Sequence, residues 1–429
     1  MSRNIVPGED ELKSILVGLK TANPSAGVAK IHGLVLAANP TWQVSEKRVR
    51  KFLRNEGLVV SAPGSREIHP SSRLNEALRI EKWSGKVEVK YFNASKGKGL
   101  IAKEKLLEGD IIWKEDPFIL APEWNIYDLQ TSGRACAFCS TIFREFSSLN
   151  IACPASKEGS PCPARFCTRL CLGQSGKTHP LLCPSQNPAS VPLLSFARRA
   201  EWMALHALAQ CTSRLLLAHQ KDAEVQLAND LGVVRGLAEL GMEERFQSLR
   251  FGVEPDRDNW RKAFELYLQA FKEPSHALNQ KKLARILKLQ LPPDMAKELF
   301  EYDAFLRGLG RMSLSWYIEA HGGLYALHSH LNHSCVPNVS VRHLDQRSAL
   351  ARVTLIAKKD IEAGEELLVT YTDPSGSLKA RRKRLSEWGF GPCQCERCLV
   401  EERAAKESGA QDQEADDLAD QLKAGLGVM

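Results

Sequence analysis

Cysteine is the residue type whose spacing carries the most specific chemistry in this chain. There are 12 cysteines, and the first residues run into charged Glu9, Asp10 and Glu11 without the apolar stretch of a secretory signal. We therefore expect the thiols in a reducing compartment, where clustered cysteines more often bind metal than form disulfides.

The first cluster lies between residues 136 and 183 and combines seven cysteines with one histidine. Its members are Cys136, Cys139, Cys153, Cys162, Cys167, Cys171, His179 and Cys183. Eight soft or borderline ligands fill two tetrahedral zinc sites without a vacant position, which is typical of structural rather than catalytic zinc. Because the segment is poor in apolar residues, we expect the metal to supply much of its folding free energy.

The second cluster, formed by Cys393, Cys395 and Cys398, offers three ligands, so a fourth must come from elsewhere. The two candidates are Cys335 and Cys211. Cys211 shares the apolar face of an expected helix, where a buried inert thiol is the usual role. The residues alone leave the choice open.

Two kinds of element must position these residues: short β-type runs and longer helices. Gly97–Gly99 and Gly109–Asp110 are expected as turns between runs, because glycine punctuates chain direction. The β-type runs are expected at 87–92, 100–102, 111–113, 339–341, 349–356 and 367–370, and helices over 197–310. This order predicts an α+β fold in which one β-domain is interrupted by the cysteine-rich segment and a helical block.

Residues 1–85 are predicted to form a small helical module, for which a winged-helix-like fold is one interpretation. Its helix after Ser45 carries the cations Lys47, Arg48, Arg50 and Lys51. A basic recognition helix would suit nucleic acid, but a solvated cationic face is the interpretation that we favour. At the other end, the acidic stretch 401–429 is expected to be a frayed helix or disordered.

Composition narrows the function classes further. The net charge of +7 permits an acidic partner without requiring nucleic acid. No window approaches the ~18 uninterrupted apolar residues of a membrane span. His321, His328, His330 and His343 have no ligand-type neighbours at metal spacing, so core or solvent roles are expected for them.

Several short motifs then occur in an order that resembles one family. Asn332-His333-Ser334-Cys335, followed by Tyr371 and Cys393-x-Cys395-x2-Cys398, resembles a SET domain with its post-SET zinc site, and Lys96-Gly97-Lys98-Gly99 resembles the glycine motif of that domain. The first cysteine cluster resembles a MYND zinc finger. Over residues 87–400 the chain resembles the SET-and-MYND (SMYD-like) protein-lysine methyltransferases, of the fungal type without a large C-terminal helical lobe.

The resemblance implies an architecture and a metal content. It implies a β-rich SET domain interrupted by a MYND finger and a helical insert. The implied zinc content is three ions: Cys136, Cys139, Cys167 and Cys171 on one, Cys153, Cys162, His179 and Cys183 on the second, and Cys335 completing the third. The expected parts are a helical N-terminal module (1–85), the SET N-terminal part (87–135), the MYND finger (136–183), the helical insert (190–310), the SET core (311–385), the post-SET site (386–400) and an acidic tail (401–429).

The resemblance also implies an activity, transfer of a methyl group from S-adenosylmethionine to a protein lysine. Histone tails are the family-typical substrate, histone four by analogy, and other proteins are an alternative. Tyr371 is expected to orient the lysine amine, with Tyr325 beside it in the substrate channel. The residues expected to line the cofactor are Lys96, Gly97, Lys98, Gly99, Ser329, Leu331, Asn332, His333, Tyr371 and Phe390.

Methyl transfer requires a neutral lysine amine, which costs roughly 4–5 kcal/mol at pH 7 in water. Burial beside a cationic sulfonium lowers the pKa of that amine, so no dedicated strong base is expected. A competing interpretation is a catalytically weak SET scaffold that acts in chromatin as an adaptor, with the MYND finger binding proline-rich partners. In either case we expect a monomer in the nucleus and cytoplasm, with nucleic acid as an auxiliary contact only.

Overall fold

The computed structural model describes residues 7–22, 28–55, 71–72, 74, 78–93, 96–143, 150–156, 159, 161–221, 224–248, 255–314, 322–344, 351–387, 390 and 392–408. The chain divides into two compact units, Met1–Ile68 and His69–Met429, and each is described by itself. Within the described ranges, no helix combines the length and apolar character that crossing a membrane requires.

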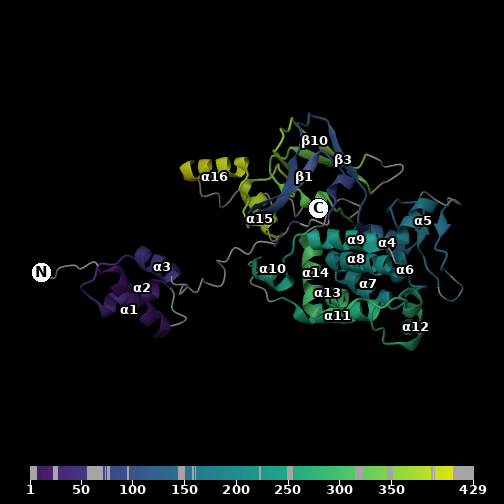
Figure 1. Cartoon of the computed structure of the whole chain (residues 1–429), viewed down its shortest axis with the longest axis horizontal. Helices are drawn as coiled ribbons and strands as arrows, with labels where there is room; N and C mark the ends of the chain where they lie inside the picture. The colour runs from purple at the N-terminus through teal and green to yellow at the C-terminus, as the bar shows by residue number, and fades with distance from the viewer. Residues whose placement is uncertain are drawn as a thin grey trace, which may run out of the picture. The chain divides into compact units, whose positions relative to one another are not determined.

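The described residues of the first unit form three helices, α1 (Glu9–Ala22), α2 (Val28–Ala38) and α3 (Glu46–Asn55), shown in purple in Figure 1. Ser45 precedes α3, and its hydroxyl accepts a hydrogen bond from the Arg48 amide at 3.3 Å, as a helix N-cap does. The helices pack on a small apolar core that includes Leu12, Ile31 and Leu53. The helical prediction is therefore confirmed, while the segment that would supply the wing of a winged helix, 56–70, lies outside the described residues.

The second unit contains a β-core assembled from distant parts of the chain. A four-stranded sheet has the order β1-β2-β11-β8 and a three-stranded sheet the order β3-β10-β9, with β4 and β7 forming a further pair. The strands are β1 (Val87–Asn93), β2 (Gly97–Ala102), β3 (Ile111–Glu115), β4 (Ile119–Leu120), β7 (Gly323–Leu324), β8 (Asn332–His333), β9 (Val339–Arg342), β10 (Val353–Ala357) and β11 (Glu366–Val369). Because β2 pairs with β11, residues near 100 and near 367 lie side by side, and the prediction of one interrupted β-domain is confirmed.

Two β-type expectations were wrong in detail. Gly97–Gly99 lies inside β2 rather than in a turn, paired with β1 as far as Asn93. The register shifts between Tyr91 and Asn93, and this bulge accommodates Gly97 at a φ of +72° within the ladder. Of the run expected at 349–356, residues 349 and 350 lie outside the described part, and strand β10 begins at Val353 rather than at 351.

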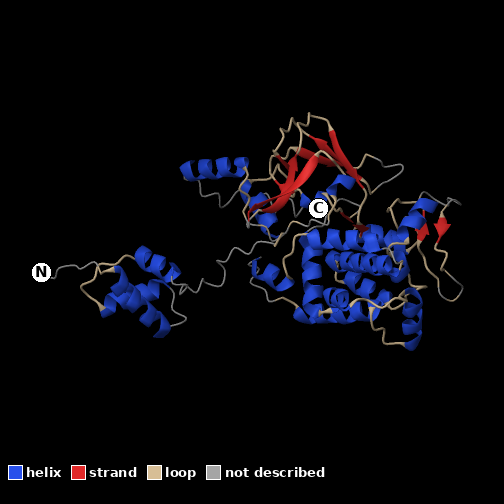
Figure 2. Cartoon of the chain, viewed as in Figure 1, coloured by secondary structure: helices blue, strands red, loops and turns tan. Residues whose placement is uncertain are grey.

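The chain between these strands forms a helical lobe, which we define as helices α7 to α14. Its helices are α7 (Ser190–Arg199), α8 (Met203–Gln220), α9 (Glu224–Gly236), α10 (Met242–Ser248), α11 (Arg257–Phe271), α12 (Ala277–Ile286), α13 (Pro293–Phe300) and α14 (Tyr302–Leu314). Figures 1 and 2 show the bundle of α7, α8, α9, α11, α13 and α14. These helices share one core, in which Leu205, Trp260, Tyr267 and Phe271 are all buried.

The cysteine module, residues 136–183, follows α4 (Trp124–Thr131), and its described residues contain little regular structure. Its elements are β5 (Ile151–Ala152), β6 (Arg165–Phe166), α5 (Arg169–Ser175) and α6 (His179–Leu182). Two short 3-10 helices, η1 (Ile80–Lys82) and η2 (His328–His330), lie outside the cysteine module.

Helices α15 (Leu378–Glu387) and α16 (Glu396–Ser408) end the described chain. The acidic stretch 401–429 was expected to be a frayed helix or disordered, and its described part, residues 401–408, continues α16 and so agrees with the helical alternative. The reason is pairing across the helices, since Arg381 bonds to Glu401 and Arg382 bonds to Glu402 at 2.8 Å. Residues 409–429 lie outside the described part.

Candidate active site and metal centres

Three groups of ligand-type side chains converge in the described part of the chain. Within each group the ligand atoms all lie within 4.8 Å of one another. Measured Sγ–Sγ distances include 3.4 Å for Cys167–Cys171 and 3.9 Å for Cys153–Cys183. A tetrahedral zinc with Zn–S bonds of about 2.3 Å separates its sulfurs by about 3.8 Å, so the geometry fits zinc. The groups are Cys136, Cys139, Cys167 and Cys171; Cys153, Cys162, His179 and Cys183; and Cys335, Cys393, Cys395 and Cys398.

The choice between Cys335 and Cys211 is decided by position in the fold. Cys335 lies 3.5 Å from Cys398, sulfur to sulfur. Cys211 is buried in the helical lobe, where burial raises the pKa of its thiol to about 12 and keeps it protonated. A protonated thiol is a poor metal ligand, so the prediction of an inert core cysteine agrees with its surroundings.

A fully buried guanidinium lies against the third group. Arg381 of α15 is 2% exposed, and its Nη2 lies 3.5 Å from the Cys398 sulfur. It also donates to the Gly376 carbonyl at 2.5 Å and pairs with Glu401. The cation therefore offsets negative charge on the clustered thiolates and ties both terminal helices to the cluster.

The glycine motif of β2 packs against the Asn332 segment at a distance that leaves no room for a side chain. A Cβ added to Gly99 would lie 2.6 Å from Asn332 Nδ2 and 2.8 Å from Glu366 Oε1. Asn332 Nδ2 donates to the Lys98 carbonyl at 3.1 Å and to Glu366 at 2.9 Å. Gly99 is thus required by protein packing that joins β2, β8 and β11.

The two lysines of the glycine motif differ in exposure and in the group that each ammonium contacts. The Lys96 ammonium is half-exposed, pairs with Glu366 and lies 4.5 Å from the centroid of the Phe92 ring. The Lys98 ammonium is buried and donates to the carbonyl of Gly236, at the end of α9. Burial lowers the pKa of Lys98 to about 8.

Tyr371 is brought to this site by parallel pairing of β8 with β11, which ends two residues before it. Its hydroxyl donates to the Leu331 carbonyl, and its amide donates to His333 Nδ1 at 3.0 Å. The rings of His333 and Phe390 lie 5.4 Å and 5.2 Å from the Tyr371 ring. Burial of the hydroxyl raises the pKa of Tyr371 well above its usual value, so the phenol is protonated at neutral pH.

The structure assigns core positions to several other candidates. The Tyr325 hydroxyl donates to the Ala351 carbonyl at 2.5 Å, with the residue 1% exposed. Ser329 donates to the Ala326 carbonyl at 2.9 Å. His328 and His330 are buried, as expected of core histidines, and burial lowers both pKa values. His321 lies outside the described residues.

Glu115 is a residue that the motifs did not indicate. Its carboxylate accepts bonds from the amides of Leu327 at 2.8 Å and His328 at 3.0 Å, and burial raises its pKa to about 7. It therefore holds the turn that precedes Leu331. A charged residue on the buried side of a strand, in Trp113-Lys114-Glu115, was the available signal.

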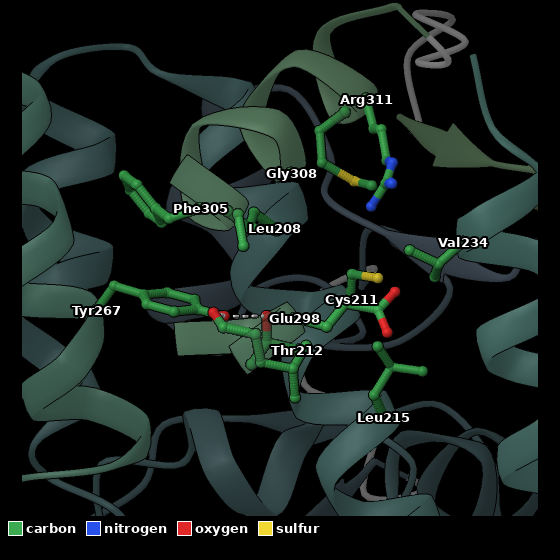
Figure 3. Close-up of a pocket in the computed structure, with 13 residues that line it drawn as sticks. Leu208, Cys211, Thr212, Leu215, Val234, Tyr267, Glu298, Phe305, Gly308 and Arg311 are labelled. Atoms are coloured by element: carbon green, nitrogen blue, oxygen red, sulfur yellow. Dashed lines mark hydrogen bonds between the residues drawn. The ribbon is translucent and has the colours of Figure 1, made fainter. Parts of the chain in front are cut away.

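A cavity in the helical lobe lies apart from these groups. Cys211, Glu298 and Arg311 point into it, and Thr212 and Tyr267 bond to each other at its wall (Figure 3). Its volume of about 30 Å³ has room for about two water molecules and excludes a cofactor or a peptide.

Comparison with known proteins identifies the family. The SET domain family model matches residues 97–372, well over half of the chain. The histone-lysine N-methyltransferase SET5 of Mycosarcoma maydis is 32% identical, over 72% of this chain and 67% of that protein. SET5 of Yarrowia lipolytica is 30% identical, over 94% and 84%, and SET5 of Candida albicans is 27% identical, over 98% and 88%.

Solved structures give a weaker likeness. The structure of Rubisco LSMT bound to AdoMet is 14% identical with a TM-score of 0.32, and this chain covers 56% of it. The sequence matches alone are sufficient: the chain belongs to the SET-domain family, in company with the fungal SET5 proteins.

Proposed function

We propose that this protein is an S-adenosylmethionine-dependent protein-lysine N-methyltransferase whose substrate is a histone. The observation that carries the proposal is the meeting of three distant segments, Gly97–Gly99, Asn332–His333 and Tyr371, at the strands β2, β11 and β8 of the four-stranded sheet. Relatives that share this chain nearly end to end are named histone-lysine N-methyltransferases. Histone four is the substrate we test first, and the nucleus is the proposed location.

The chemistry of the donor set fits S-adenosylmethionine. The buried Lys98 ammonium has three N–H donors and meets one acceptor, the Gly236 carbonyl, among the described residues. A carboxylate such as that of the cofactor would satisfy and neutralise it. The residues proposed to hold the cofactor are Lys96, Gly97, Lys98, Gly99, Ser329, Leu331, Asn332, His333, Tyr371 and Phe390. When bound, the cofactor supplies an electrophilic methyl group on a sulfonium.

Tyr371 acts in this proposal by orientation rather than as a base. Its phenol stays protonated because its pKa is raised, and its hydroxyl is held by the Leu331 carbonyl. A protonated, fixed hydroxyl can align a lysine amine and cannot remove its proton at neutral pH. The neighbouring rings of His333 and Phe390 exclude water, which lowers the pKa of an entering lysine. Tyr325 remains a proposed channel residue, with its hydroxyl held by the Ala351 carbonyl.

We further propose three zinc ions, two in the cysteine module as a MYND-type finger and one at Cys335, Cys393, Cys395 and Cys398. The support is the ligand grouping, with no vacant position for a substrate in any group. Closed sites of this kind stabilise the fold rather than react. We also propose the part boundaries inferred from the sequence, a monomeric state, and proline-rich partners of the finger.

The experiment is peptide mapping by mass spectrometry of core histones incubated with S-adenosylmethionine and enzyme. Tyr371→Phe should lower the methylation rate by about 100-fold, the effect of removing one positioned donor, while calorimetry still detects cofactor binding. The matched control is Tyr91→Phe, because Tyr91 is exposed on β1, and it should methylate at the wild-type rate.

Equal rates for Tyr371→Phe and wild type would refute the role of Tyr371. No methylation and no cofactor binding by the wild-type protein would refute the enzyme and favour the adaptor interpretation.

A further inference from the structure

The chain immediately before the β-core pairs with the helical lobe. The Ser71 amide donates to the Glu239 carbonyl at 2.7 Å, and the Glu239 amide donates to the Ser71 carbonyl at 2.9 Å. These two bonds form an isolated antiparallel bridge between segments more than 160 residues apart in sequence. We call Ser71–Ser72 the strap.

Ser72, the second residue of the strap, contacts the glycine motif of β2. The Ser72 hydroxyl accepts a hydrogen bond from the Lys98 amide at 3.3 Å. A Cβ added to Gly97 would lie 2.8 Å from the Ser72 Cβ and 3.2 Å from its Oγ. The space that Gly97 leaves open is therefore occupied by Ser72, while its φ of +72° independently favours glycine.

Residues 236–239, at the end of α9, bond to both the strap and the glycine motif. The Gly236 carbonyl accepts from the Lys98 ammonium, and three residues later Glu239 pairs with Ser71. The Glu239 carboxylate is itself fixed by Arg311 and lies 3.8 Å from Arg307, both on α14. The strap, the motif lysine and α14 are thus anchored together at residues 236–239.

We propose that the strap is a positioning element of the cofactor site, holding the Gly97–Lys98 end of β2 in its binding geometry. Ser72 acts through the Lys98 amide and is a positioning residue rather than a catalytic one. Without the strap, the Lys98 amide loses its acceptor, the Ser72 hydroxyl, and the backbone at Gly97 loses its contact with Ser72. A bulge already weakens the ladder at this end of β2. The inference rests on the proposed function, because it takes β2 as the cofactor strand.

The test compares Ser71→Pro with Ser71→Ala in the full-length, zinc-loaded protein. Proline lacks the amide that bonds to Glu239, whereas alanine keeps it and removes only the side chain of an exposed serine. Ser71→Pro should weaken S-adenosylmethionine binding in calorimetry by about ten-fold. It should also raise KM for the cofactor with kcat nearly unchanged and speed amide exchange at Lys98. Ser71→Ala should stay within two-fold of wild type.

Ser72→Ala is the second variant, because it keeps the strap paired and removes the acceptor of the Lys98 amide. It should weaken binding about three-fold and leave the melting temperature unchanged. Wild-type cofactor affinity in both Ser71→Pro and Ser72→Ala, with exchange at Lys98 accelerated, would overturn the inference while leaving the enzyme intact. A wild-type protein that binds no cofactor would instead overturn the proposed function.

Discussion

The helical lobe and the cysteine module each have a buried core, but the two cores consist of different side chains. In the helical lobe the core is made of large apolar residues such as Leu205, Tyr267 and Phe305. In the cysteine module six of the eight buried residues of the core cluster are cysteines, beside Ala164 and Phe166. Thiols bury little apolar area, so the module lacks the hydrophobic free energy that holds the lobe.

One chain can therefore stabilise two of its regions by different interactions, apolar packing in one and metal binding in the other. A packed lobe depends on volume and shape, since interiors are filled to crystal-like density. A ligand cluster depends on a bound ion, which can contribute on the order of 10 kcal/mol or more at neutral pH. Each region should therefore fail under conditions that leave the other in place.

The largest expected effect is metal removal. A strong chelator under reducing conditions should bring amide exchange of peptides within 161–183 to the rate of an unfolded chain. Peptides from α8 and α11 should keep their protection, because their core contains no metal ligand. Hydrogen exchange with mass spectrometry measures both regions at once.

Added zinc should restore the protection, and elemental analysis should find about three ions per chain before chelation. Unchanged exchange in 161–183 after verified metal loss would show that packing around Phe166 holds the module.

The reverse perturbation is Phe305→Ala in the helical lobe. Phe305 is 1% exposed and packs on Phe264 and Tyr267 at ring distances of 5.3 Å and 5.2 Å. The cavity left by the ring should lower the free energy of unfolding by about 3–5 kcal/mol, measured by urea titration, with zinc content unchanged. Leu278→Ala is the control, because Leu278 is 65% exposed and should change stability by less than about 0.5 kcal/mol.

Loss of zinc from Phe305→Ala at urea concentrations where the lobe is still folded would contradict the independence of the two regions.

The smallest expected effect concerns the contact between α4, which leads into the cysteine module, and α8. His206 stacks on Trp124 at 5.6 Å and meets Tyr127 edge-on at 5.0 Å. Burial lowers the pKa of His206 to about 4 from 6.5. Between these values the unfolded chain binds more protons, so the free energy of unfolding falls as the pH drops from 6.5 toward 4. The contribution is about 1.4 kcal/mol per pH unit.

His206→Phe keeps a ring in the stack and removes that slope, which urea titrations at pH 6.5 and 5.5 can measure. His276→Phe, at an exposed position outside this contact, is the matched control for replacing a histidine by phenylalanine. An unchanged slope in His206→Phe would show that His206 does not titrate in this range.

Much of the candidate site could be predicted, because short motifs in a fixed order carry the family resemblance. The grouping of the cysteines into ligand sets and the placing of Asn332, His333 and Tyr371 in one site were implied by that resemblance, and the structure brings these residues together. The part that could not be predicted involves single long-range contacts without a motif. Glu115 on the amide of Leu327 and Ser72 on the amide of Lys98 are such contacts, because any short polar residue could have stood there.

From the sequence alone, the ligand-type residues could be identified by their type and spacing, while their division into sets and the roles of the motif lysines and Tyr371 came from the family resemblance. Ligand type and spacing are local properties, so they can be read without the fold. The family resemblance implied Cys335 rather than Cys211 as the fourth ligand of the third group. The tertiary structure places Cys335 in that group, and it decided that Gly97 and Gly99 face protein atoms. It also decided that Lys98 is buried against the end of α9. Such outcomes depend on how strands and helices from distant segments pack, and no local pattern encodes that packing.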